Sequence, residues 1–277
     1  MAFNTAYDLD SLMVATKAAT VYTAQENSLF LGGSLIPMVN LPAGSLSAQI
    51  PVLGAVTANK LTSAGVAGSG SDFNTNGNDF DALGITDTKV TIGANIYAAR
   101  DVIRDLGGID AGELGRVLGN AVAKAFDQDV ITAMSSLTAS TDDSDPVSVD
   151  SIFNAVAQIR GAGEMGQLFG IISPAQVANL MKAIGTQAYA GGDFQTEALR
   201  NGFVGSIGGV RLFQSAYVSG TNKGFIFSPD ALRIAMFKNV DLEVQRRAAA
   251  VGNDIVASLH AGVGVIDATR GVKLVNV

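Results

Sequence analysis

A glycine-rich segment is the first place in this sequence where residue types and spacing suggest chemistry. Gly161-Ala162-Gly163-Glu164-Met165-Gly166 matches the dinucleotide-binding pattern G-x-G-x-x-G letter for letter. That fingerprint needs a strand before the glycines and a helix after them, because the helix N-terminus then faces the pyrophosphate. Here a helical pattern precedes the glycines and a strand pattern follows them. We therefore interpret the segment as a helix end and a turn, and we predict no cofactor site.

The only histidine of the chain, His260, limits both acid–base and metal chemistry. A Ser-His-Asp triad or a histidine metal site would have to be built around this one side chain, and there is no cysteine to add a soft ligand. His260 lies inside ASLHAGVGV, an apolar run typical of a strand. We expect a structural or surface histidine, with pH sensing at an interface as the alternative.

Three acidic residues and two arginines complete the candidates. Asp142, Asp143 and Asp145 offer oxygen ligands for calcium, but the glycine and the distal glutamate of an EF-hand loop are missing, so we predict a solvated turn. Arg246 and Arg247 end a strand pattern, where pairing with acidic groups of a neighbouring subunit is favoured over weak contact with nucleic acid. No residue is assigned as catalytic, cofactor-binding or metal-ligating, and we expect no enzymatic activity.

The composition indicates a protein that is covered by other subunits. Of the 277 residues, 48% are hydrophobic and only 16% are charged, whereas about a quarter is usual for the charged class. So few charges leave weakly polar surface for copies or partners to cover. The net charge of -7 and the lack of a basic run argue against tight, direct DNA binding. With no cysteine, cohesion must come from packing and strand pairing.

The segment from 27 to 59 contains no charged residue and is longer than a membrane span requires. It is not a transmembrane helix, because Pro37, Pro42 and Pro51 would break it and leave backbone groups unpaired in lipid. The part up to residue 44 has neither periodicity nor turn chemistry. We predict an extended arm there.

Apolar periodicity predicts four helices. The longest would span roughly 39 Å at about 1.5 Å per residue. Ser173-Pro174-Ala175-Gln176 predicts a capping box at the start of the last one. The expected helices cover 8–26, 111–137, 149–160 and 174–184.

Alternating or continuously apolar runs predict the strands. A stretch of small and polar residues separates the strands expected at 47–53 and 85–96, which suggests a long hairpin. Because an isolated two-stranded hairpin is only marginally stable in water, we expect this one to lie on a neighbouring subunit. The runs at 240–245 and 255–265 alternate strictly around a Gly252-Asn253-Asp254 turn, which predicts an antiparallel pair. The expected strands cover 47–53, 85–96, 168–172, 210–214, 224–227, 232–237, 240–245, 255–265 and 272–277.

Three stretches carry a resemblance to a known family: GSIGGVRLFQSAYV (205–218), FIFSPDALRIAMFKNVDLEV (225–244) and IVASLHAGVGVIDATRGVKLV (255–275). They are similar to the glycine turn, the Ser-Pro-Asp-Ala-Leu element and the returning strands of tailed-bacteriophage major capsid proteins, which have the Hong Kong 97 fold. The likeness covers the chain from about residue 85 to its end, and the earlier part only by the order of elements. It implies an α+β fold and the function of a major capsid protein.

The resemblance also implies how the chain is divided. The expected segments are an N-terminal arm (1–45), an extended β-hairpin loop that overlaps the next subunit (46–95), a peripheral domain with a long spine helix (96–137), an axial domain (138–237), returning strands of the peripheral domain (238–266) and a C-terminal strand of the axial domain (267–277).

The partners and location follow from the same resemblance. Copies would form pentamers and hexamers of an icosahedral shell that encloses double-stranded DNA without sequence-specific binding and without a membrane. Portal, scaffolding and decoration proteins are further expected partners, and the location is the virion, with the host cytoplasm during assembly. Some members cross-link their shells through a loop lysine; Lys60 lies in that region, but no partner residue is identified and we assign no cross-link. The family's upstream scaffolding segment is not found, which implies a separate scaffolding protein or assembly without one.

Two other functions stay open. The first is an encapsulin, a bacterial compartment shell of the same fold. Encapsulins generally have a shorter extended loop, so the long Gly-, Ser- and Asn-rich stretch at 55–81 favours the phage capsid protein. A small-molecule enzyme with an α/β core is the second, although nucleophile, base and cofactor signatures are missing.

Overall fold

The computed structural model describes residues 6–42, 44–53, 61–62, 65–66, 87–104, 111–142, 146–186, 203–218 and 220–275. The chain forms two compact units, one of Met1–Ala48 with Ile92–Val277 and one of Gln49–Thr91. Lys60, Asp143, Asp145 and most of the expected polar hairpin tip lie outside the described residues.

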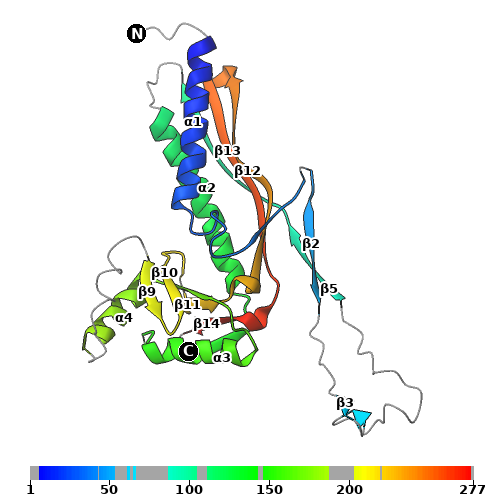
Figure 1. Cartoon of the computed structure of the whole chain (residues 1–277). Coiled ribbons are helices and arrows are strands. Elements are labelled where there is room, and N and C mark those ends of the chain that lie inside the picture. Colours follow the sequence, from blue (N-terminus) through cyan, green and yellow to red (C-terminus); the bar gives the residue numbers. More distant parts are fainter. Residues whose placement is uncertain are drawn as a thin grey trace. The chain divides into compact units, whose positions relative to one another are not determined.

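A four-stranded sheet forms one half of the larger unit, in the order β1-β12-β13-β6 (Figure 1). β1 is parallel to β12, whereas the β12–β13 and β13–β6 pairs are antiparallel. Alternate residues of β13, such as Ala257 and Leu259, are fully buried in the main core, because every second side chain of a strand faces the same way. The strands are Met38–Asn40 (β1), Leu232–Arg247 (β12), Gly252–Val265 (β13) and Asn95–Arg104 (β6).

Two long helices, α1 (Ala6–Asn27) and α2 (Ala111–Met134), pack against one face of this sheet (Figure 1). They run parallel and approach closely at two glycines of α2. A Cβ on Gly115 would lie 2.7 Å from the carbonyl oxygen of Thr16, and one on Gly119 would lie 2.6 Å from that of Thr20. Only glycine allows such contact, so α1 packs by backbone proximity although its apolar stripe is weak.

A six-stranded sheet forms the other half of the larger unit, in the order β7-β14-β11-β8-β10-β9. Its central strand β8 is buried at all five residues. Phe169 and Ile171 face the main core, whereas Leu168 and Ile172 join a second core with helices α3 (Val149–Gly161) and α4 (Pro174–Thr186). The strands are Ala139–Asp142 (β7), Gly271–Val275 (β14), Asn222–Phe227 (β11), Leu168–Ile172 (β8), Val210–Gln214 (β10) and Phe203–Ile207 (β9).

The smaller unit contains most of a two-stranded sheet of β2 (Ser47–Leu53) and β5 (Asp87–Gly93). The Thr88 hydroxyl donates to the carbonyl oxygen of Val52 at 3.2 Å. A short antiparallel pair joins β3 (Leu61–Thr62) to β4 (Gly65–Val66). None of the described helices is both long and apolar enough to cross a membrane.

The helix and most strand predictions are confirmed within a few residues, but several details differ. The strand expected at 85–96 is two strands, β5 and β6, and the strands expected at 232–237 and 240–245 are one strand, β12. Irregular pairing near Lys238 lets β12 continue through the polar residues that had suggested a break. Five strands, β1, β3, β4, β7 and β9, were not predicted, because each is short and lacks a clear alternation in the sequence.

The turn between β12 and β13 lies earlier than expected. It consists of a 3₁₀ turn at Ala248–Ala250 and Val251, whose φ of 46° is left-handed, while Gly252 already belongs to β13. A β-branched residue is strained in this conformation, so the sequence pattern pointed to the glycine instead.

The capping box predicted at Ser173 is wrong. The Gln176 side chain accepts from the backbone N–H of Val147 at 2.9 Å, and the N–H of Ser173 donates to the carbonyl oxygen of Lys223 at 3.1 Å. The box forms instead at α3, where Ser148 and Ser151 cap each other's backbone. Tertiary neighbours compete for Gln176, which the local pattern cannot show.

Candidate functional site

The glycine-rich segment has the order that the sequence predicted, with a helix before it and a strand after it. α3 ends at Gly161, Gly163 has a φ of +92°, and β8 follows. The backbone N–H of Gly166 donates to Oε1 of Glu164 at 2.7 Å. The Glu164 carboxylate thus occupies a backbone N–H group that a dinucleotide phosphate would need as a donor. The segment is a turn between α3 and β8.

The other predicted candidates lie on separate elements. His260 is half-buried in β13, paired with Lys238 of β12 and Ile96 of β6. Arg246 and Arg247 lie exposed at the end of β12. Among the residues that the structure describes, no group of three or more His, Cys, Asp or Glu side chains could hold a metal.

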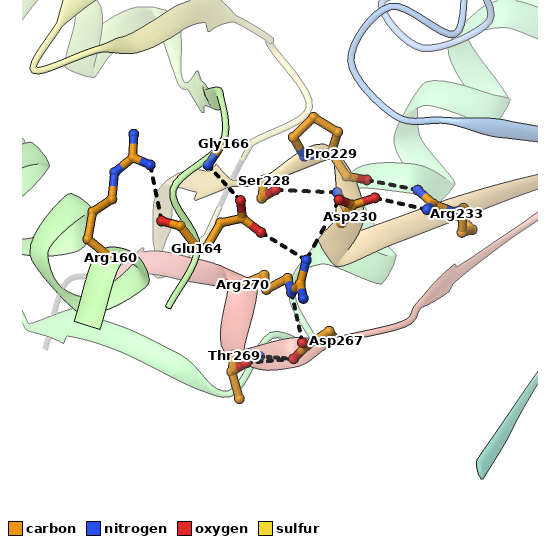
Figure 2. A network of polar contacts seen from close by, with 10 residues as sticks. All are labelled: Arg160, Glu164, Gly166, Ser228, Pro229, Asp230, Arg233, Asp267, Thr269 and Arg270. Atoms are coloured by element: carbon orange, nitrogen blue, oxygen red, sulfur yellow. Dashed lines mark hydrogen bonds and ion pairs between the residues drawn. The ribbon is translucent and has the colours of Figure 1, made fainter. Parts of the chain in front are cut away.

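A polar cluster lies where the chain passes between the two sheets, and sequence reasoning did not predict it. We call it the crossover network (Figure 2). It includes residues from two 3₁₀ turns, Pro229–Ala231 between β11 and β12, and Ala268–Arg270 between β13 and β14. Its charged members are Arg160, Glu164, Asp230, Arg233, Asp267 and Arg270.

Backbone hydrogen bonds join the two crossovers directly. The N–H of Ser228 donates to the carbonyl oxygen of Arg270 at 3.0 Å. The N–H groups of Ile266 and Asp267 donate to the carbonyl oxygen of Ala231 at 2.8 and 3.2 Å. The two crossovers therefore form one hydrogen-bonded element.

Arg270 lies at the centre of the crossover network. Its Nη1 is 2.9 Å from Oε2 of Glu164 and 3.7 Å from Oδ2 of Asp230, and its Nε is 3.0 Å from Oδ2 of Asp267. Asp230 also pairs with Arg233 of β12 through Oδ1 at 2.9 Å. One guanidinium thus links three carboxylates from three different segments (Figure 2).

Asp267 is held in its charged form at this site. Burial alone would raise the pKa of its carboxyl group, but hydrogen bonds from Thr269 and Arg270 outweigh burial and lower the pKa. The hydroxyl and the N–H of Thr269 donate to Oδ1 at 2.6 and 3.0 Å. Charge and hydrogen bonding therefore fix the second crossover.

A close backbone contact lies in the four-stranded sheet near the end of β13 that leads to the second crossover. A Cβ on Gly262 of β13 would lie 2.1 Å from the carbonyl oxygen of Gly93. Ile92 of β5, whose Cγ2 would lie 2.8 Å from the same Cβ, is almost fully buried. The chain thus crosses the sheet at a position where no side chain would fit.

Asp127 of α2 fixes the segment that follows α1. Its side chain is only 5% exposed and accepts from the Ser28 hydroxyl at 2.5 Å and from the Leu29 N–H at 2.9 Å. Burial raises the pKa of this carboxyl group despite these hydrogen bonds. Such a buried acceptor has a structural role, because its donors are backbone and side-chain groups of the segment that follows α1.

Large apolar side chains are exposed on the outer surface of the helix pair. Val14, Tyr22 and Val117 are 68%, 65% and 60% exposed. Tyr22 also lines an open groove between α1 and α2 together with Glu113 and Arg116. Exposed apolar groups of this kind are typical of surfaces that other chains cover.

No protein-family model matches the chain, and no curated protein matches it either. Solved structures do match. The capsid of the cyanophage P-SCSP1u is 16% identical with a TM-score of 0.67, over 88% of this chain and 87% of the cyanophage chain. The mature capsid of bacteriophage PhiM1 is 17% identical with a TM-score of 0.59, over 91% and 88% of the two chains. This chain has the phage capsid fold.

The phage capsid fold confirms the α+β class that the resemblance implied. A virus-like particle from Pyrococcus furiosus also matches, at 13% identity and a TM-score of 0.66, over 95% of this chain and 98% of that one. At these identities the likeness concerns the arrangement of the backbone. Within the phage capsid fold, the crossover network connects the two sheets.

Proposed function

We propose that this chain is the major capsid protein of a tailed phage, which self-assembles into the icosahedral shell around the phage DNA. The observation that carries the proposal is the capsid-like backbone along about nine tenths of the chain, 88% and 91% in two phage capsids. The low charged fraction of 16% and the exposed Val14, Tyr22 and Val117 fit a subunit covered by its copies.

The proposal assigns each part of the chain to a domain of the capsid subunit. The half with the four-stranded sheet would be the peripheral domain, with α2 as its spine, and the half with the six-stranded sheet would be the axial domain, including β14. The unit Gln49–Thr91 would be the extended loop that overlaps the next subunit. Its separation from the rest of the chain as a compact unit supports this part of the proposal.

In this role the chain would form pentamers and hexamers, act with portal and scaffolding proteins and with decoration proteins, and reside in the virion after assembly in the host cytoplasm. The enclosed double-stranded DNA would be held without sequence-specific contacts, because the chain is acidic overall at -7. Chemistry on a substrate would not be its task.

The test is assembly of the purified chain, followed by negative-stain electron microscopy and light scattering. Hexamers, pentamers or closed shells are expected. A chain that remains a monomer at all concentrations, with and without co-expressed phage assembly proteins, contradicts the proposal. Deletion of residues 58–79 is expected to weaken or block shell formation while the six-stranded half stays folded, and normal shells from this variant would contradict the loop assignment.

A bacterial compartment shell would have the same fold, so the content of natively purified particles separates the two functions. Packaged double-stranded DNA supports the phage proposal. A protein cargo in place of DNA supports the compartment.

A further inference from the structure

The two halves of the larger unit share the main core, in which Phe169 and Phe227 of the six-stranded sheet pack with Leu232 and other residues of the four-stranded half. The chain also passes between the halves at three places. The chain passes from β11 to β12, from β13 to β14, and from α2 to β7. Two of these passages carry the 3₁₀ turns Pro229–Ala231 and Ala268–Arg270, which contain no large apolar side chain. Backbone hydrogen bonds and charges therefore make the contact between these two crossovers.

The crossover network forms an unbroken series of contacts from helix α3 to strand β12 (Figure 2). Nη1 of Arg160, in α3, donates to the carbonyl oxygen of Glu164 at 3.1 Å. The Glu164 carboxylate pairs with Arg270, which is 3.7 Å from Asp230, and Asp230 pairs with Arg233 in β12. α3 packs on the six-stranded sheet and β12 belongs to the four-stranded sheet, so the series spans both halves.

We propose that the crossover network holds the two sheets at a single relative orientation, and that Arg270 is its central positioning residue. This inference rests on the proposed function for its consequence: in a shell, one fixed orientation per subunit would restrict the assembled particles to one size. Shell curvature depends on the angle between neighbouring subunits, and a subunit with a variable internal angle would build several curvatures.

Arg270 suits this role because its loss leaves like charges together. Glu164, Asp230 and Asp267 contribute three carboxylates, and in the ion pairs of the network they face only Arg233 and Arg270, because Arg160 binds the Glu164 carbonyl oxygen. The Glu164 side chain is only 11% exposed, so water replaces a lost partner poorly there. Without Arg270 the three carboxylates would repel one another across the two crossovers and the α3–β8 turn.

The experiment compares the full-length chain with Arg270→Gln. Backbone hydrogen exchange is measured by mass spectrometry on unassembled subunits, and shell diameters are measured by cryo-electron microscopy after assembly. We expect exchange at residues 228–233 and 266–272 to rise by about fivefold or more, because local opening becomes easier. We also expect the variant shells to have a broader or a divided diameter distribution.

The matched control is Arg100→Gln, which removes an ion pair with Asp254 between β6 and β13, inside one sheet. It should leave exchange at both crossovers and the shell diameter unchanged. Salt gives a second readout, since the Debye length at about 1 M salt is about 3 Å, and attraction between charges farther apart than this is largely screened. Crossover exchange in the unsubstituted chain should rise with salt, whereas that in Arg270→Gln should not.

Unchanged crossover exchange and a single shell diameter in Arg270→Gln would overturn the inference and leave the proposed function standing. Failure of the unsubstituted chain to assemble would overturn the proposed function. The exchange and salt measurements would then still test whether the crossover network fixes the relative orientation of the two sheets. If Arg270→Gln does not fold, Glu164→Gln replaces it, because the glutamine oxygen keeps the acceptor for Gly166, while its NH2 group replaces the charged oxygen that accepts from Arg270. The same outcomes apply.

Discussion

The carbonyl oxygen of Gly93 lies so close to Gly262 that a Cβ on Gly262 would be only 2.1 Å away. Contacts this short do not occur between real atoms, and the obstacle is backbone, which cannot rotate away as a side chain can. Strand β13 therefore needs glycine where the end of β5 crosses it.

Gly262→Ala should destabilise the subunit by about 1 to 3 kcal/mol, because the end of β5 must move. The matched control is Gly93→Ala at the other side of the same contact, where a Cβ would meet nothing within 4 Å. Urea unfolding of unassembled subunits, followed by circular dichroism, measures both variants. Equal losses in the two would contradict the close approach.

Gly119→Ala tests the contact between α1 and α2. In a helix interior this substitution normally stabilises by about 0.5 to 1 kcal/mol, but here the new Cβ would lie 2.6 Å from the carbonyl oxygen of Thr20. We expect a net loss of stability and faster proteolysis of α1. The control is Gly161→Ala at the end of α3, where the Cβ would meet no atom within 4 Å. A stabilising Gly119→Ala would show that the helices are not this close.

Asp127→Ala should cost about 2 to 3 kcal/mol, because the Leu29 N–H and the Ser28 hydroxyl lose their buried acceptor. Asp127→Asn keeps one acceptor oxygen and the shape, so it should cost clearly less. Thermal unfolding of the two variants gives the comparison. If the two are equally destabilised, the charge of Asp127, and not its hydrogen bonding, stabilises the segment that follows α1.

The ion pair between Lys17 of α1 and Asp241 of β12 should make stability depend on pH. The Lys17 ammonium, 2.6 Å from Asp241, lowers the pKa of this carboxyl group to about 2. A lowered pKa in the folded chain means that the contribution is complete above about pH 4 and is lost as the pH falls toward about 2. Lys17 is half exposed, so solvent screening limits the contribution to about 1 kcal/mol or less.

Lys17→Gln should therefore lower the free energy of unfolding near pH 6 and make little difference near pH 2. Lys124→Gln, at an exposed position of α2, is the control. Urea unfolding at a series of pH values measures the difference between each variant and the unsubstituted chain. A difference for Lys17→Gln that stays constant from pH 6 to pH 2 would argue against the ion pair.

Local patterns were sufficient for the secondary structure where one physical signal dominated. The apolar spacing of α2 and the continuous apolar run of β8 appear in the structure almost as predicted. Predictions failed where tertiary neighbours competed. The capping box at Ser173 is absent because Val147 binds Gln176, and β12 continues past Lys238 because its pairing with β13 tolerates irregular residues.

The sequence by itself determined the α+β class, the weakly charged composition and the resemblance to phage capsid proteins. These are properties of residue order and type, which neighbouring positions express without long-range contacts. Only the tertiary structure decided that Arg270 meets Glu164, 106 residues earlier, and that Gly262 meets Gly93. The reason is that such partners are chosen by where strands cross and chain segments return, and no local pattern of charge or glycine encodes that crossing.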